Sequence, residues 1–274
     1  MNIFQVPNTF MQISVNPFHN DKPYTEDWTL IRLIERADTF QQRTRPANKG
    51  QIFQFEITKE LEDWKYRIGD FIQYESDNNK NIIVAINEQD LLSAKSGYAS
   101  HRYNDPFLRS YEQKILVHTT TKENYEKIIS SGELKCWNLC KAENADWESK
   151  PIGALSNDPA NYSNYIMFGT GGVFQELIPL CKQRGFIDMD LDSTYTAGAR
   201  FYFGAEKVVD DGLLIRDGVH LKVKHRLPFN PYLLWVATPM EIGIPEQTTP
   251  RKFAEMSDRI FSEKFGIIPK DIGY

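Results

Sequence analysis

The pattern of apolar and polar residues is clearest over residues 115–132. Apolar residues at 115–117 predict a short buried strand, and His118 with three threonines at 119–121 follows where that strand must end. The sequence therefore places an imidazole and several hydroxyl groups at the terminus of a strand.

The residues that follow carry signals for both ends of a helix. Thr120 and Glu123 have the spacing of a capping box, and Gly132 can supply the left-handed residue that closes a helix. The apolar stripe between them has helical spacing: Tyr125, Ile128 and Ile129. The unpaired N–H groups and positive dipole end of this helix would suit a phosphorylated or otherwise anionic ligand. The alternative is that the histidine only satisfies the end of the strand.

Residues 1–105 have the pattern of a small α+β unit. The spacing of apolar residues predicts an amphipathic helix over residues 28–40, and alternation at 52–57 predicts a half-buried strand. A polar turn precedes a second predicted strand at 80–86. The polar stretch 101–106 ends in a proline, and we expect it to connect this unit to the central strand.

Residues 151–165 have the high content of Gly, Asn, Asp and Pro that is typical of a loop. Long ordered loops in compact domains are usually binding loops or lids. We therefore expect substrate contacts at Tyr162 and Tyr165, with simple packing as the alternative. The glycines at 169–172 predict a turn.

Glu176 lies within the apolar segment 173–180. If its side chain faces inward, the buried carboxylate needs a partner or a chemical role. The alternative is an outward-facing, solvated glutamate.

The last third of the chain alternates short apolar runs with turns and ends in a helical pattern at 250–265. These runs imply a split antiparallel or mixed sheet. The predicted strands are residues 185–189, 200–203, 219–223 and 232–237.

The length, the net charge, the cysteines and the apolar runs of the chain limit the classes of protein to which it can belong. At 274 residues, the chain can bury a substantial core without disulfides or a structural metal. The net charge of −5 argues against a general nucleic-acid coat, although a local basic patch would still suffice to hold a nucleic acid. Cys136, Cys140 and Cys181 form an odd set without a disulfide framework. Cys136 and Cys140 resemble half of a metal site, but we interpret them as buried structural thiols and expect no metal site, because no second Cys or His pair with zinc-like spacing lies nearby. No apolar run predicts a signal peptide or a membrane span, so we expect a cytoplasmic protein without a membrane partner.

Three patterns resemble a known superfamily. The run Val117-His118-Thr119-Thr120, followed by a helix that contains Asn and ends at Gly132, resembles the first strand and helix of the ADP-ribosyltransferase superfamily. Gln175-Glu176 resembles the segment that supplies the catalytic glutamate in those enzymes. A later series is similar in order to the end of RNA 2′-phosphotransferases, which share this fold: Ile187-Asp188, Tyr195, Gly198, Phe201-Tyr202, His220-Leu221, Leu227-Pro228 and Tyr232-Leu233.

The resemblance implies an α+β fold in two parts. Residues 106–274 would form a catalytic domain with split mixed and antiparallel sheets of the ADP-ribosyltransferase type, and residues 1–105 an N-terminal α+β accessory unit. It implies that the chain transfers ADP-ribose from NAD, its substrate, to a nucleic acid or a protein.

The implied site has two catalytic residues, His118 and Glu176. His118 would hydrogen-bond the ribose, and Glu176 would orient the nucleophile or a ribose hydroxyl while the nicotinamide bond breaks through an oxocarbenium-like state. The expected NAD-binding residues are His118, Thr119, Thr120, Tyr165 and Tyr202.

Two other classes of function remain open. His118-Thr119-Thr120 has the H-x-T form of a two-histidine phosphoesterase with His220 as a partner, and an RNA 2′-phosphotransferase would share the fold. A non-catalytic interaction module on the same scaffold is the third possibility, because a fold does not establish chemistry.

Overall fold

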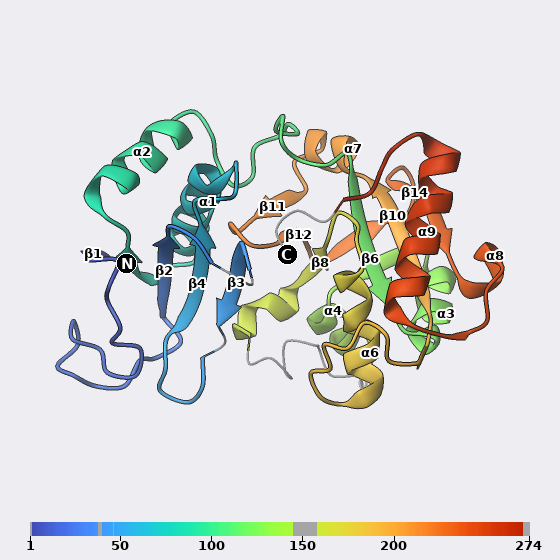
Figure 1. Cartoon of the computed structure of the whole chain (residues 1–274), viewed down its shortest axis with the longest axis horizontal. Coiled ribbons are helices and arrows are strands. Elements are labelled where there is room, and N and C mark those ends of the chain that lie inside the picture. Colours follow the sequence, from blue (N-terminus) through green and yellow to red (C-terminus); the bar gives the residue numbers. More distant parts are fainter. Residues whose placement is uncertain (1, 38–39, 46, 145–157, 271–274) are drawn as a thin grey trace.

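The computed structural model describes residues 2–37, 40–45, 47–144 and 158–270. The protein is α+β, with several mixed and antiparallel sheets, and the chain folds into two parts that lie side by side in Figure 1. The N-terminal part contains one five-stranded sheet, and the C-terminal part contains two three-stranded sheets and two short strand pairs.

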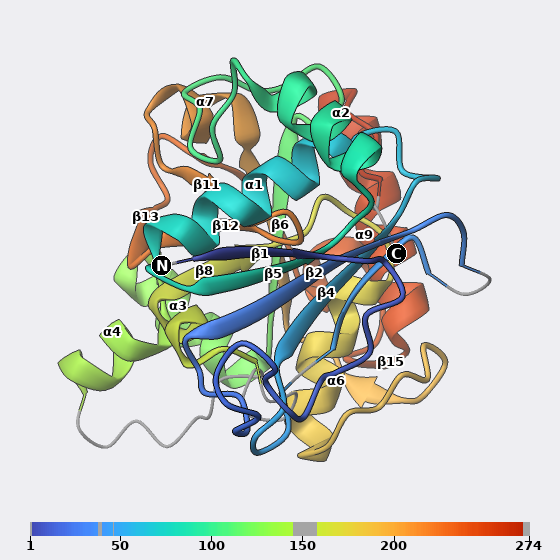
Figure 2. The ribbon, with the colours of Figure 1, turned by 90° about the vertical axis from the view of Figure 1, so that its left-hand side faces the viewer.

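The N-terminal sheet has the order β1-β5-β2-β4-β3. Its strands are parallel except for β3, which runs antiparallel to β4. Two helices cover one face of the sheet, and residues of the first 24 positions cover much of the other; Figure 2 views this part of the molecule directly. The elements are β1 (Ile3–Val6), β2 (Trp28–Ile34), β3 (Gln42–Arg45), β4 (Phe53–Thr58), α1 (Trp64–Asp77), β5 (Asn81–Ala85) and α2 (Glu88–Tyr98).

The helix predicted at residues 28–40 is wrong, because Trp28–Ile34 is strand β2. This strand pairs with β5 on one side and β4 on the other, and nearly all of its residues are buried. A strand that is buried on both faces has a continuous run of apolar residues, and this run cannot be distinguished by its pattern from the apolar residues of a buried helix. The strands predicted at 52–57 and 80–86 are confirmed by β4 and β5. The predicted half-burial of the first is wrong, because β4 lies between β2 and β3 and all of its residues are buried.

The C-terminal part is organised around β6. This strand pairs along its whole length with β10, and β14 pairs with the other edge of β10. A second sheet has the order β11-β12-β8. The elements are β6 (Ile115–Thr120), α3 (Lys122–Ser131), β7 (Glu133–Lys135), α4 (Trp137–Glu143), η1 (Ala160–Asn164), β8 (Tyr165–Phe168), η2 (Phe174–Glu176), α6 (Leu177–Arg184), β9 (Tyr195–Thr196), β10 (Ala199–Gly204), α7 (Ala205–Asp210), β11 (Leu214–Arg216), β12 (Leu221–Lys224), β13 (Arg226–Pro228), β14 (Leu233–Ala237), α8 (Pro239–Ile242), β15 (Gln247–Thr248) and α9 (Pro250–Phe265).

The predicted strand and helix over 115–132 are confirmed, with corrections at the end of the strand and at the turn. Strand β6 extends to Thr120, so His118 lies within the strand and not at its terminus. The N-cap is Thr121, whose hydroxyl accepts the N–H of Asn124, whereas Thr120 is still part of β6. Gly132 closes the helix with a φ of 69°, as its position predicts.

Of the strands predicted in the last third of the chain, those that pair with another strand in the structure are confirmed, and the one without a pairing partner is wrong. The expected strands at 200–203, 219–223 and 232–237 correspond to β10, β12 and β14, and the expected C-terminal helix is α9. Residues 185–189 form no strand and expose Phe186 and Met189.

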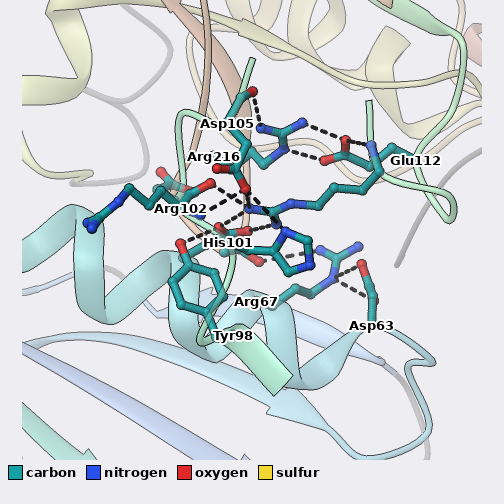
Figure 3. A network of polar contacts seen from close by, with 12 residues as sticks. Asp63, Arg67, Tyr98, His101, Arg102, Asp105, Glu112 and Arg216 are labelled. Atoms are coloured by element: carbon teal, nitrogen blue, oxygen red, sulfur yellow. Dashed lines mark hydrogen bonds and ion pairs between the residues drawn. The ribbon is translucent and has the colours of Figure 1, made fainter. Parts of the chain in front are cut away.

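Buried ion pairs join the two parts. Arg109 donates from Nη1 and Nη2 to the two carboxylate oxygens of Asp70 on α1, at 2.7 and 2.8 Å. Arg216 of β11 binds Glu112, which precedes β6, and also donates to the carbonyl oxygen of Asp105 at 3.4 Å (Figure 3). Such charges are tolerated away from water because each has a close, hydrogen-bonded partner.

Candidate functional site

A cavity of about 810 Å³ lies beside the end of β6. Its walls come from β6, β8 and one face each of α3, α4 and α6, and Gln42 alone among its described lining residues belongs to the N-terminal part. The predicted loop 151–165 contributes Tyr162 and Tyr165, and residues 151–157 of that loop lie outside the described residues.

The cavity opens where the two three-stranded sheets separate. Val117 of β6 and Gly169, just after β8, exchange two backbone hydrogen bonds of 2.7 and 2.9 Å. Beyond this isolated bridge the two strands diverge, because β6 pairs with β10 and β8 pairs with β12. The split creates room for a ligand at the end of β6.

His118 lines this cavity with its imidazole held in one orientation. Nδ1 lies 3.1 Å from the carbonyl oxygen of Met167, and the ring meets Phe168 edge-on at 5.9 Å. Because a carbonyl only accepts hydrogen bonds, Nδ1 carries the proton and Nε2 keeps its lone pair. Burial lowers the pKa of His118 to about 4, so the ring is neutral at pH 7.

The neighbouring threonines and Tyr165 also line the cavity. Thr119 donates its hydroxyl to the carbonyl oxygen of Gln175 at 2.8 Å, which joins β6 to the opposite wall. Thr120 points to the same side of the strand as His118 because side chains alternate along a strand. Tyr165 holds the ammonium group of Lys222 over its ring at 4.7 Å. These expected NAD-binding residues therefore come together around one space.

Tyr202, the remaining expected NAD-binding residue, is absent from the described lining. It pairs with Val117, whereas His118 pairs with Phe201, so alternation turns Tyr202 and His118 to opposite faces of the sheet. Its hydroxyl donates to Asp258 of α9 at 2.6 Å, on the side away from the cavity.

Glu176 also lies on that opposite side. The apolar segment 173–180 forms the 3₁₀ turn η2 and the first part of α6. The Glu176 carboxylate is fully buried, accepts from Tyr195 at 2.9 Å and lies 3.2 Å from Arg200 Nη1. Burial raises the pKa of Glu176 to about 7, although Arg200 and Tyr195 oppose the rise. The structure therefore does not bring His118 and Glu176 together.

The network around Glu176 nevertheless contacts the cavity wall. Arg200 donates to the carbonyl oxygen of Gly172 at 3.0 Å, and the Gly172 N–H donates to Asp258 at 2.9 Å. Gly169, Thr170 and Gln175 of the same segment line the cavity. Glu176, Arg200 and Asp258 thus hold this wall against β10 and α9 without reaching the cavity.

Several lining residues were not identified from the sequence. Lys182 comes from α6, and Trp137 comes from α4. The signal available for Lys182 was the spacing of Ile178, Pro179 and Lys182 along one helical face, but it becomes visible only once residues 177–184 are recognised as a helix.

His220, the expected partner of His118 in a two-histidine site, also lines the cavity. Its Nδ1 lies 3.2 Å from the Asp217 carboxylate, and its ring meets Tyr162 edge-on at 5.4 Å, where the two parts of the molecule join. His118 instead contacts Phe168 in the core of the C-terminal part. The two imidazoles thus approach the cavity from different sides of β8.

Two of the three cysteines line the cavity, Cys136 and Cys140, and the third, Cys181, is a buried residue of α6. Cys136 is buried as predicted, whereas Cys140 is only partly buried because the cavity exposes it. Within residues 2–37, 40–45, 47–144 and 158–270, no three His, Cys, Asp or Glu side chains are grouped to hold a metal ion. In the same ranges, no helix has both the length and the apolar character required to cross a membrane.

Comparison of the chain with models of protein families, with curated proteins and with solved structures finds no match. We therefore infer a function from the cavity itself.

Proposed function

We propose that the cavity binds NAD and that the protein transfers ADP-ribose from it to a nucleic acid or a protein. One observation carries the proposal: His118, in the second half of β6, offers an oriented Nε2 acceptor to a cavity formed by the split between two sheets. A neutral, fixed imidazole is suited to accept a hydrogen bond from a ribose hydroxyl.

The size and lining of the cavity support a dinucleotide ligand. Its volume of about 810 Å³ lies in the upper part of the range for small-molecule and cofactor sites. Trp137 and Tyr165 provide aromatic surface, while Thr120 and Asn124 provide hydrogen-bonding groups. A molecule with flat bases and polar sugars matches this mixture.

The proposed reaction breaks the bond between nicotinamide and ribose. Positive charge develops at the anomeric carbon, so ribose orientation and a nearby negative charge lower the barrier. His118 orients the ribose, and its low pKa excludes it as a proton donor at neutral pH. Because Glu176 faces away from the cavity, the proposal gives it a positioning role and leaves Glu133, Glu143 and Asp158 as the described carboxylates that line the space.

Calorimetric titration with NAD tests the proposal first. We expect saturable binding to the wild-type chain and a loss of affinity in His118→Ala, with Lys207→Met on the remote helix α7 as a charge-changing control. Incubation with NAD labelled in the ADP-ribose moiety, together with DNA, RNA or protein, then identifies the acceptor. Failure of the folded wild-type chain to bind NAD would eliminate the proposal.

The same titration separates the second candidate, a two-histidine phosphoesterase. Its supporting observation is that His118 and His220 line one cavity, each with Nδ1 held by an oxygen. Hydrolysis of a 2′,3′-cyclic nucleotide that requires both histidines would favour the phosphoesterase over NAD transfer.

A further inference from the structure

Lys182 projects from the wall of the cavity formed by α6. Ile178, Pro179 and Lys182 line the cavity from one face of this helix, while Leu177 and Leu180 of the other face pack into the core. The helix therefore fixes where the lysine side chain enters the cavity.

The ammonium group of Lys182 has no ion-pair or hydrogen-bond partner among the described residues. Another lining lysine, Lys135, contrasts with it, because its ammonium lies 3.2 Å from Glu133 and 2.5 Å from Glu143. Lys182 is only partly exposed, and burial lowers its pKa. A partly desolvated cation without a counter-ion is costly to the folded chain, so its placement in a cavity calls for an anion from outside.

Among the described residues, no carboxylate interacts electrostatically with Lys182. The lining residues that do so are His118 and Cys140. The imidazole is neutral at pH 7, and burial raises the pKa of the Cys140 thiol, which keeps it protonated. The carboxylates of Glu133 and Glu143 are already engaged by Lys135.

We propose that Lys182 forms an anion subsite that binds the diphosphate of the nucleotide whose ribose is held by His118. This inference rests on the proposed function, because it assigns the diphosphate of NAD to the Lys182 side of the cavity. The aromatic surface of Trp137 and Tyr165 is then left for the bases.

Binding of inorganic pyrophosphate and of NAD, measured by calorimetry, tests the subsite. Lys182→Met removes the charge but keeps an unbranched apolar stem, Lys182→Arg retains the charge, and Lys207→Met removes a lysine that pairs with Asp211 away from the cavity. We expect Lys182→Met to weaken both ligands by about 10-fold to 100-fold, the effect of losing one charged hydrogen bond. Lys182→Arg should retain most of the affinity, and Lys207→Met all of it.

Thermal unfolding and competition provide controls for folding. Lys182→Met should unfold at the wild-type temperature or above, because it removes an unpaired, partly desolvated charge. On the wild-type chain, which needs no substitution, pyrophosphate should displace NAD competitively.

Three results would overturn the subsite: no binding of pyrophosphate to the wild-type chain, simultaneous binding of pyrophosphate and NAD, or unchanged NAD affinity in folded Lys182→Met. The last of these would leave the proposed function standing. Conversely, pyrophosphate binding that depends on Lys182, in a chain that does not bind NAD, would confirm the anion subsite and overturn NAD as its ligand.

Discussion

Arg200 Nη1 lies 3.2 Å from Glu176 Oε1, and neither side chain has any exposed surface. Arg200 also binds Asp258 through two nitrogens, at 3.0 Å each. The carboxylate of Glu176 is therefore part of a buried network that fastens the 169–176 wall of the cavity to the sheet.

We predict that Glu176→Gln lowers the free energy of unfolding by about 1–3 kcal/mol, because the amide nitrogen of Gln cannot accept one of the two hydrogen bonds that the carboxylate oxygens take from Tyr195 and Arg200. Chemical denaturation measures this loss. Glu241→Gln is the matched control, since Glu241 pairs with Lys264 at 3.1 Å on the surface and should contribute little.

The same variant distinguishes a positioning role from direct catalysis. A positioning role predicts weaker NAD binding together with the loss of stability, because the wall shifts. A fall in turnover of about two or more orders of magnitude, with stability and NAD affinity unchanged, would instead identify Glu176 as the catalytic carboxylate.

His118 should remain neutral, with its proton on Nδ1, from pH 8 down to about pH 5. Burial and the Met167 carbonyl account for this state, and the pKa of about 4 sets its lower limit. Nitrogen-15 shifts of the imidazole measure the tautomer directly. An imidazole that protonates near pH 6.5 would show that the ring is more exposed than the structure indicates.

The buried state of His118 also affects stability. Because the folded chain disfavours the charged ring, this group lowers stability as pH falls from about 6.5 towards 4. His118→Ala should lose that pH dependence and remain folded, and loss of NAD binding in the folded variant would support the ribose contact.

Glu75, near the end of α1, should make stability fall as pH rises. Its side chain is buried, Oε2 has no hydrogen-bond partner in the described residues, and burial raises its pKa to about 7. The unfolded chain releases this proton from about pH 4.5, so stability is greatest below that pH and is lost as pH rises to about 7.

The rise in pKa corresponds to at most about 3 kcal/mol. We therefore expect Glu75→Gln to unfold at a higher denaturant concentration than the wild-type chain at pH 8 and at the same concentration at pH 4. Equal stabilities at both pH values would contradict the buried placement. Glu176 changes the stability of the wild-type chain and of Glu75→Gln with pH in the same direction. The difference in stability between the two chains therefore reports on Glu75 alone.

Gly218 joins the two parts of the molecule and should not tolerate a side chain. Its φ is +87°, and an added Cβ would lie 2.4 Å from the carbonyl oxygen of Arg67 on α1. Gly218→Ala should lower the free energy of unfolding by about 2–4 kcal/mol through overpacking and backbone strain. Gly212 has a similar φ of +68° with open space around it, so Gly212→Ala should cost only about 1 kcal/mol. Equal losses in the two variants would contradict the close packing at Gly218.

Local signals predicted the strand and the helix around His118 well. The apolar run before His118, the apolar stripe of the next helix and Gly132 act over a few residues, and the structure contains the strand and helix that they predict. The choice between Thr120 and Thr121 as the cap was off by one residue, because pairing of Thr120 with Ala199 extends the strand.

The wrong predictions for β2 and Tyr202 concern residues whose environment depends on pairing between strands that are distant in the sequence. Strand β2 looked like a helix because its burial depends on two distant strands. Tyr202 looked like a pocket residue, but its pairing with Val117 turns it away from the cavity. A shift of one residue in register would have reversed that outcome, and no local pattern fixes the register.

Because Val117 and Gly169 form an isolated bridge, β8 can move away from β6 more easily than β10 can. Along the backbone, drawing β8 away from β6 breaks two hydrogen bonds, whereas separating β6 from β10 would break a ladder of six residue pairs. A ligand can therefore widen or narrow the split at a smaller cost than any distortion within either sheet. The hydrogen-exchange rates of the Val117 and Gly169 amides therefore measure how strongly a bound molecule holds the two sheets together.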